Sequence, residues 1–167
     1  MDHIWSPWRY QYVAASRRPE GCIFCAMAEV PATGSVADEQ NFIVFRGAYH
    51  FVVLNRYPYT SGHLMVVPYQ HTPDLGAISE GAANELMHLT RQAEKHLRTL
   101  YRPDGVNLGM NLGEAAGAGV AGHIHMHVLP RWIADANFMT TIGETRVVPE
   151  DLSVSWRRLR DVFSELG

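Results

Sequence analysis

Residues 122–131 constrain the fold more than any other segment of the chain. Histidines occupy positions 123, 125 and 127, and apolar residues stand between and after them. This alternation is typical of a half-buried β-strand, because successive side chains of a strand point to opposite faces. The pattern therefore predicts a strand that carries His123, His125 and His127 on one face. Its other face is expected to turn Ile124, Met126 and Val128 towards the core.

The row of imidazoles has three interpretations. It could be an exposed polar face, a metal site in which neighbouring rings chelate one ion, or a catalytic row in which one ring attacks and the others orient it and bind charge. A chance run of three alternating histidines is improbable in a chain that contains nine histidines. The metal and catalytic interpretations are therefore favoured, and they do not exclude each other.

Composition indicates one soluble globular domain. The chain has 167 residues, of which 47% are hydrophobic and 19% charged. A formal net charge of −3 provides no basic field for nucleic acid, and no apolar run approaches the roughly 18 residues that span a membrane. The N-terminus lacks the basic and apolar regions of a signal peptide, so a cytoplasmic location is expected.

Further elements follow from periodicity and turn residues. A long amphipathic helix is expected after the N-cap Ser79, because apolar residues recur every three or four positions up to Leu100. His88 and His96 fall on or near its polar side and are expected at the surface. The expected strands are residues 41–45 and 50–54, which form a hairpin, residues 63–68 and residues 106–111. Together these elements predict an α+β fold, with an antiparallel sheet and a helix packed on one face.

The two ends are expected to flank this unit. Residues 1–21 form a Trp-rich N-terminal arm with a possible helix over 9–15, and residues 132–167 form a C-terminal extension. Within the extension, residues 132–148 have no clear period and are expected to be an ordered loop. A final helix is expected after Pro149, with an apolar stripe of Trp156, Leu159, Phe163 and Leu166.

Cys22 and Cys25 form a single Cys-x-x-Cys motif. Such a motif is half of a zinc site or a dithiol redox pair, and on its own it favours neither strongly. The redox interpretation expects a βαβ context, and nothing before Cys22 has a strand pattern. Two thiols in a chain without an export signal are expected to be reduced.

Residues 123–129 match the pattern His-φ-His-φ-His-φ-φ, in which φ is apolar. This pattern resembles the signature of the histidine triad superfamily of nucleotide hydrolases and transferases. The resemblance runs from about residue 22 to 131 and includes blocks at 52–58 and 62–68. The segments 5–9, 130–132 and 135–139 are similar to bacterial dinucleoside polyphosphate phosphorylases. The resemblance implies a single domain over 1–167, a five-stranded antiparallel sheet with a long helix, and a homodimer or larger even assembly joined through sheet and helix.

The resemblance also implies roles for individual residues. His125 is expected to attack the α-phosphorus of a dinucleoside polyphosphate and form a nucleotidyl-histidine, which water or inorganic phosphate then resolves. His127 is expected to contact a phosphate oxygen or the leaving group, and Asn55 the ribose. Asn111 and the loop glycines Gly117 and Gly119 are expected to surround the phosphates, since glycine lets backbone N–H groups approach closely.

A structural zinc ion is implied as well. In zinc-bearing members of the superfamily, the positions that match Cys22, Cys25, His71 and His123 hold the metal. Such a Cys₂His₂ set suits tetrahedral zinc without an open position. His63 and His50 are alternative ligands.

One departure from the family pattern concerns the reaction. Many hydrolases of the superfamily carry Gln and then Ser or Thr in the loop before the triad, whereas this chain has Gly117-Ala118-Gly119-Val120. The missing hydroxyl favours phosphorolysis of diadenosine tetraphosphate to ATP and ADP. The alternatives are hydrolysis of dinucleoside polyphosphates, hydrolysis of nucleoside phosphoramidates, and a non-catalytic nucleotide- or metal-binding protein.

Overall fold

A computed structural model of the chain describes residues 21–29, 36–133, 135 and 150–164. The predictions for the N-terminal arm, for the loop over 132–148 and for Leu166 lie almost wholly outside these ranges. Within them, no helix is long and apolar enough to cross a membrane.

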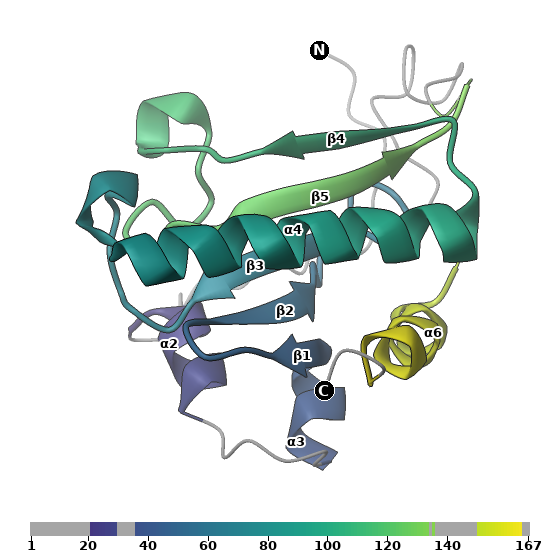
Figure 1. Cartoon of the computed structure of the whole chain (residues 1–167), viewed down its shortest axis with the longest axis horizontal. Coiled ribbons are helices and arrows are strands. Elements are labelled where there is room, and N and C mark those ends of the chain that lie inside the picture. The colour runs from purple at the N-terminus through teal and green to yellow at the C-terminus, as the bar shows by residue number, and fades with distance from the viewer. Residues whose placement is uncertain (1–20, 30–35, 134, 136–149, 165–167) are drawn as a thin grey trace, which may run out of the picture.

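The core of the fold is a five-stranded antiparallel sheet, which confirms the predicted α+β class (Figure 1). Its spatial order is β1-β2-β3-β5-β4, so the last strand along the chain is inserted between β3 and β4. The strands are β1 (Ile43–Arg46), β2 (His50–Leu54), β3 (Leu64–Pro68), β4 (Gly105–Gly109) and β5 (Met126–Arg131).

One face of the sheet is covered by the long helix α4, Glu80–Tyr101, which crosses β5 and β3 in Figure 1. The hydroxyl of Ser79 accepts a hydrogen bond from the Ala82 N–H, so the predicted N-cap is confirmed. Arg102 ends the helix in the left-handed conformation, directly before Pro103. The buried stripe of α4 packs on alternate strand residues to form the larger core.

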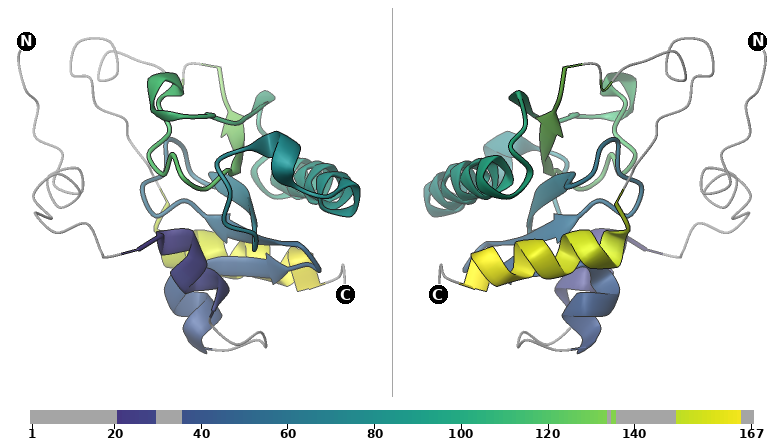
Figure 2. Two further views of the ribbon diagram at one scale, coloured as in Figure 1. Left: turned by 90° about the vertical axis from the view of Figure 1, so that its left-hand side faces the viewer. Right: turned by 90° about the vertical axis from the view of Figure 1, so that its right-hand side faces the viewer.

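The opposite face is covered by the short helix α2, Ile23–Ala28 (Figure 2). Strand β2 serves both cores, because Val52 and Leu54 face α4 whereas Phe51 and Val53 face α2. The other helical elements within the described ranges are α3 (Val36–Asn41), the 3₁₀ turns η1 (Leu75–Ala77) and η2 (Glu114–Ala116), and α6 (Leu152–Phe163). The expected apolar stripe of α6 is buried at Leu159 and Phe163.

Several predictions were wrong in detail. The strands expected over residues 41–45 and 106–111 run over 43–46 and 105–109, because Asn41 belongs to α3 and β4 ends before Asn111. The histidine strand begins only at Met126, so His123 and His125 precede β5. Strand β3 ends at Pro68, which has no N–H to extend the ladder, and the Pro68 carbonyl accepts a hydrogen bond from the His123 ring instead.

His96 is buried and not on the surface, because α6 brings Phe163 against its ring.

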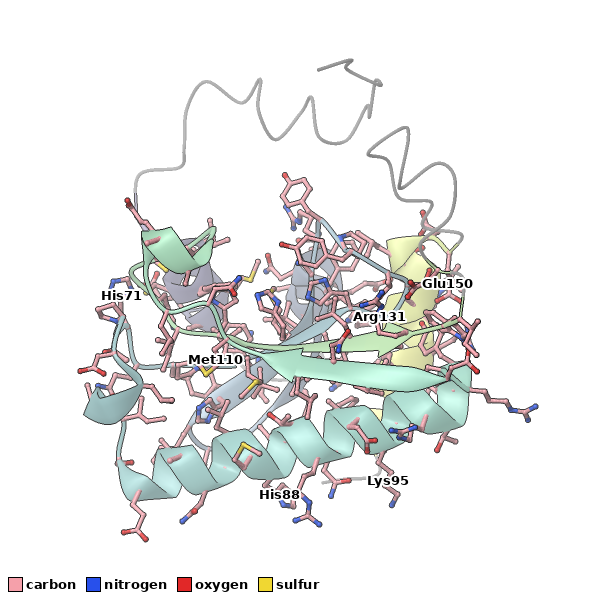
Figure 3. All side chains as sticks on the ribbon, turned by 90° about the horizontal axis from the view of Figure 1, so that it is seen from above. His71, His88, Lys95, Met110, Arg131 and Glu150 are labelled. Carbon is pink, nitrogen blue, oxygen red and sulfur yellow. The ribbon has the colours of Figure 1, made fainter. Side chains whose placement is uncertain are left out.

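His88 lies on the outer face of α4 as predicted, and Figure 3 shows its side chain pointing away from the sheet. Figure 3 also places His71 near one end of the sheet, with Arg131 and Glu150 towards the other end. The candidate site includes His71 and the residues directly before β5, which the fold brings together.

Candidate active site

His125 is buried directly before β5, and its two ring nitrogens have different roles. Its Nδ1 lies 2.9 Å from the carbonyl oxygen of His123. A carbonyl can only accept a hydrogen bond, so Nδ1 of the neutral ring carries the proton and Nε2 carries the lone pair. His125 therefore presents Nε2 as a potential nucleophile, and the backbone fixes its tautomer.

His127 is held by a histidine from another strand. Its Nδ1 lies 2.8 Å from Nε2 of His63, which directly precedes β3. The Nδ1 of His63 accepts from the Tyr59 N–H at 3.3 Å, and the Asn55 side-chain Nδ2 lies 3.3 Å from the same atom. A backbone N–H can only donate, so the proton of neutral His63 resides on Nε2 and is donated to His127.

This chain of hydrogen bonds leaves the proton of neutral His127 on Nε2, the atom that remains available to a substrate. Burial and the nearby His125 ring lower the pKa of His127 to about 4. Burial also lowers the pKa of His125, although the hydrogen bond to the His123 carbonyl acts in the opposite direction. At neutral pH the site therefore offers one unprotonated imidazole nitrogen on His125 and one N–H donor on His127, with ring centroids 4.8 Å apart.

A second cluster adjoins the triad. The structure brings together the four predicted metal ligands, whose donor atoms all lie within 4.8 Å of one another: Cys22, Cys25, His71 and His123. Cys22 caps α2 and Cys25 lies in its first turn. The Ile124 N–H donates to the Thr72 carbonyl, and this hydrogen bond brings His123 and His71, which precede these two residues in the chain, close together. Residues from three distant parts of the sequence thus meet at one point.

The donor atoms fit a tetrahedral metal ion. Nδ1 of His123 lies 3.3 Å from Cys22 Sγ and 3.8 Å from Cys25 Sγ, and Nδ1 of His71 lies 3.3 Å from Cys25 Sγ. Zinc–sulfur and zinc–nitrogen bonds of about 2.3 and 2.0 Å place tetrahedral donors roughly 3.3–3.8 Å apart. The His123 Nε2–H donates to the Pro68 carbonyl at 2.8 Å, so the lone pair is on Nδ1 as ligation requires.

The alternative ligands occupy other positions. His63 bonds His127, and the His50 ring lies 2.9 Å from the Glu85 carboxylate of α4. Neither belongs to the cluster of donor atoms found among the described residues.

The phosphate-loop candidates line the connection between β4 and β5. Asn111 is half-buried two residues after β4, and Gly117 and Gly119 are exposed beyond η2. Gly117 has φ +87°, a left-handed conformation that favours glycine. Asn55 is engaged within its own loop, because its Oδ1 accepts from the Tyr57 N–H at 2.9 Å while its Nδ2 faces His63. The contacts of these residues with a nucleotide stay predictions.

The family assignment follows from comparison with known proteins. The HIT domain family matches residues 37–132. The chain belongs to the HIT domain family. It is 40% identical over 164 residues to a Mycobacterium tuberculosis protein named AP-4-A phosphorylase, covering 95% of this chain and 83% of that protein. It is 30% identical to an uncharacterised HIT-like protein of Saccharolobus solfataricus, covering 71% of this chain and 79% of that one.

Solved HIT structures share the fold. A Zn-bound histidine triad family protein of Mycobacterium smegmatis superposes with a TM-score of 0.68 at 28% identity, covering 87% of this chain and 95% of that one. A histidine triad nucleotide-binding protein of Sulfolobus tokodaii gives a TM-score of 0.66 at 22% identity, covering 87% of this chain and 93% of the other. The second comparison bears on the fold alone.

Two residues of this HIT site have no obvious signal in the sequence. The sequence indicates His63 only as an alternative metal ligand. Its contact with His127 depends on the pairing of β3 with β5, which places Met65 opposite His127. Phe24 lies between the two cysteines, yet its ring packs against the triad. The apolar residue of a Cys-x-x-Cys motif gives no indication of which distant ring it contacts.

Proposed function

We propose that this HIT protein is an enzyme that transfers a nucleotidyl group from a dinucleoside polyphosphate through a covalent His125 intermediate. The favoured reaction is phosphorolysis of diadenosine tetraphosphate to ATP and ADP. The observation that carries the proposal is the 40% identity, over 95% of the chain, to the protein named AP-4-A phosphorylase. The tautomers of His125 and His127 give that reaction a physical basis.

In the first step, the Nε2 lone pair of His125 attacks the α-phosphorus of one adenylyl group, and a nitrogen–phosphorus bond forms. The bond from that phosphorus to the bridging oxygen breaks, so the leaving group is ATP. The His127 Nε2–H lies beside His125 and is the donor proposed to stabilise the departing oxygen, with His63 orienting the ring.

In the second step, an oxygen of inorganic phosphate attacks the adenylyl phosphorus and displaces His125. The product is ADP, whose β-phosphate comes from the acceptor. Water in the same position gives AMP, which is the hydrolase alternative. The loop sequence Gly117-Ala118-Gly119-Val120 favours phosphate, because it lacks the hydroxyl side chain that many hydrolases of the superfamily carry there. Asn111 and the loop glycines are the proposed phosphate contacts, and Asn55 is the proposed ribose contact.

We further propose that Cys22, Cys25, His71 and His123 hold a structural zinc ion. The donor distances and the His123 tautomer support it, and a similar protein of known structure is Zn-bound. Bound zinc would tie α2 and the start of β5 together with no position left for substrate. Thiolate ligands require reduced cysteines, which agrees with a proposed cytoplasmic location.

A homodimer or larger even assembly is also proposed. Among the residues that the structure describes, strand β4 pairs with β5 alone and forms an edge of the sheet. It exposes Leu108 at 51%, and Leu112 beyond it is exposed at 46%. Exposed apolar residues beside an edge that no described strand covers are suited to a second copy of the chain. Light scattering at micromolar concentration should give at least twice the mass of the chain, and Leu108→Glu should shift the mass towards that of a monomer. A monomer in the unmodified protein would contradict the dimer.

Trapping the intermediate tests the proposed chemistry. Protein mixed with diadenosine tetraphosphate in phosphate-free buffer, and denatured at alkaline pH, should gain the mass of one adenylyl group on the peptide that contains His125. The matched control is His88→Ala, which removes an exposed histidine of α4 and should still form the adduct. His125→Ala should form none. Near-normal turnover by His125→Ala would overturn both the phosphorylase and the hydrolase proposals.

A further inference from the structure

Phe24 stands where the cysteine cluster and the histidine triad meet. It is the buried residue of α2, only 2% exposed, and it lies in the chain between Cys22 and Cys25. Its ring belongs to the smaller hydrophobic core on the face of the sheet away from α4. Both of its flanking cysteines belong to the proposed metal site, so a bound ion would help to fix its position.

The Phe24 ring contacts two histidines of the triad. Its centroid lies 5.1 Å from that of His125, with the rings inclined at 51°, and 5.4 Å from that of His123 in an edge-to-face arrangement. The same His125 ring meets His127 edge-to-face at 4.8 Å. Aromatic pairs at these separations contribute packing energy and a defined relative orientation.

These contacts matter because one hydrogen bond does not fix an imidazole ring. The Nδ1 of His125 is anchored to the His123 carbonyl, but rotation about the outer side-chain torsion of histidine is intrinsically broad. Rotation of the ring would turn Nε2 away from the phosphorus. It would also break the hydrogen bond of Nδ1, so that the proton could move to Nε2. The Phe24 ring packs against the buried His125 ring, so this contact opposes such a rotation.

From this geometry we infer that Phe24 is a positioning residue for His125 and that it connects the cysteine–histidine cluster to the nucleophile. The inference rests on the proposed role of His125 as nucleophile. Phe24 would not touch the reacting atoms. It would hold Nε2 of His125 in its attacking orientation, while the cluster holds α2 and therefore Phe24.

The chain offers a matched control for this inference. Phe51 on β2 is fully buried in the same hydrophobic core, and its ring packs on Tyr69 at 5.6 Å. The substitutions Phe24→Leu and Phe51→Leu therefore remove the same ring from the same core and are expected to lower the melting temperature comparably. A core effect common to both is then separated from an effect on His125.

The first measurement is steady-state kinetics with diadenosine tetraphosphate and phosphate, together with the zinc content of each protein. Phe24→Leu should lower kcat by about tenfold or more with KM within about twofold, because a misplaced nucleophile costs rate more than binding. Phe51→Leu should keep the unmodified kcat. Equal kcat values for the two variants would overturn the inference, and so would a loss of zinc in Phe24→Leu that accounts for its lower rate.

The second measurement needs no substrate, so it separates failure of this inference from failure of the proposed function. Imidazole ¹⁵N spectra at one fixed pH report which nitrogen of each histidine carries the proton, and the His125 signals are identified by their absence in His125→Ala. The unmodified protein and Phe51→Leu should show His125 protonated at Nδ1 only. Phe24→Leu should show averaged nitrogen shifts from exchange between tautomers. Unchanged His125 shifts in Phe24→Leu would contradict a positioning role.

Discussion

His63 Nε2 lies 2.8 Å from His127 Nδ1, although the two histidines are 64 residues apart in the chain. Because the Tyr59 N–H occupies the other nitrogen of His63, the proton between the rings belongs to His63. The Nε2–H of His127 is thereby directed to the substrate side. The hydrogen-bond donor of the proposed active site is therefore specified by a residue outside the triad.

Replacement of His63 tests this relationship. His63→Ala should lower kcat by about 10²-fold, the lower end of what a positioned proton donor contributes, because His127 is free to adopt either tautomer. KM should change less than kcat. His88→Ala, on the exposed face of α4, is the control and should match the unmodified protein. If His63→Ala keeps its full kcat, the proton on His127 is not controlled by His63.

Acid should destabilise the protein through His127. Its pKa is about 4 in the folded state because of burial and the His125 ring, and about 6.5 when the chain unfolds. Between those values the unfolded state binds the proton and the folded state does not, so stability falls as pH drops from about 6.5 towards 4. Urea unfolding of His127→Gln should show a shallower loss than the unmodified protein over that interval. Parallel curves would mean that His127 keeps an ordinary pKa.

Removal of the cluster thiols tests the metal site. Cys22→Ser combined with Cys25→Ser should lose bound zinc and about 3 kcal/mol or more of unfolding free energy, since a structural metal contributes folding free energy directly. Elemental analysis and urea unfolding measure the two effects. A prolonged incubation with a zinc chelator should reproduce the loss in the unmodified protein and have no effect on the double variant. Equal zinc in both proteins would exclude these cysteines as ligands.

The end of α4 is joined to the C-terminal helix through Tyr101. Its hydroxyl donates to Glu150 at 2.6 Å, and its ring packs against Gly62, beside the loop that presents His63. Tyr101→Phe should cost about 1 kcal/mol by urea unfolding, because Glu150 keeps its bonds to Ser155 and Arg158.

Alkaline titration provides a second check on Tyr101. Burial, aided by the hydrogen bond to Glu150, raises its pKa to about 12. The folded-state pKa lies above the unfolded value near 10, so the contribution of Tyr101 is complete below pH 10 and is lost as pH rises towards 12. A near-ultraviolet absorbance titration should show a late ionisation step that is missing in Tyr101→Phe. A missing step centred near pH 10 would contradict the raised pKa.

Sequence patterns predicted most of the fold because its main elements are long or strictly periodic. The stripe from Ala82 to Leu97 specified α4, and the apolar run of β2 was recognised even though it faces two cores. Helices α2 and α3 have no clear signal in the sequence, since six residues are too few to display a helical period. Strand β5 begins at Met126 and not at His123, because the neighbouring strand β3 ends at Pro68. This boundary depends on strand pairing and not on local sequence.

The candidate site shows the same division. The family resemblance indicated the four clustered ligands, and the structure brings them together. The burial of His96 against Phe163, the bond from His63 to His127 and the packing of Phe24 on His125 all join segments far apart in the chain. Periodicity reports which face of an element is apolar, but it does not report which element covers that face.

The most direct test of the central claim is the fate of labelled inorganic phosphate. Protein supplied with diadenosine tetraphosphate and [³²P]phosphate should produce ATP without label and ADP labelled only at its β-phosphate, because phosphate resolves the adenylyl group on His125. His125→Ala should incorporate no label. Formation of ATP and AMP, with no label in ADP, would contradict phosphorolysis and leave water as the acceptor.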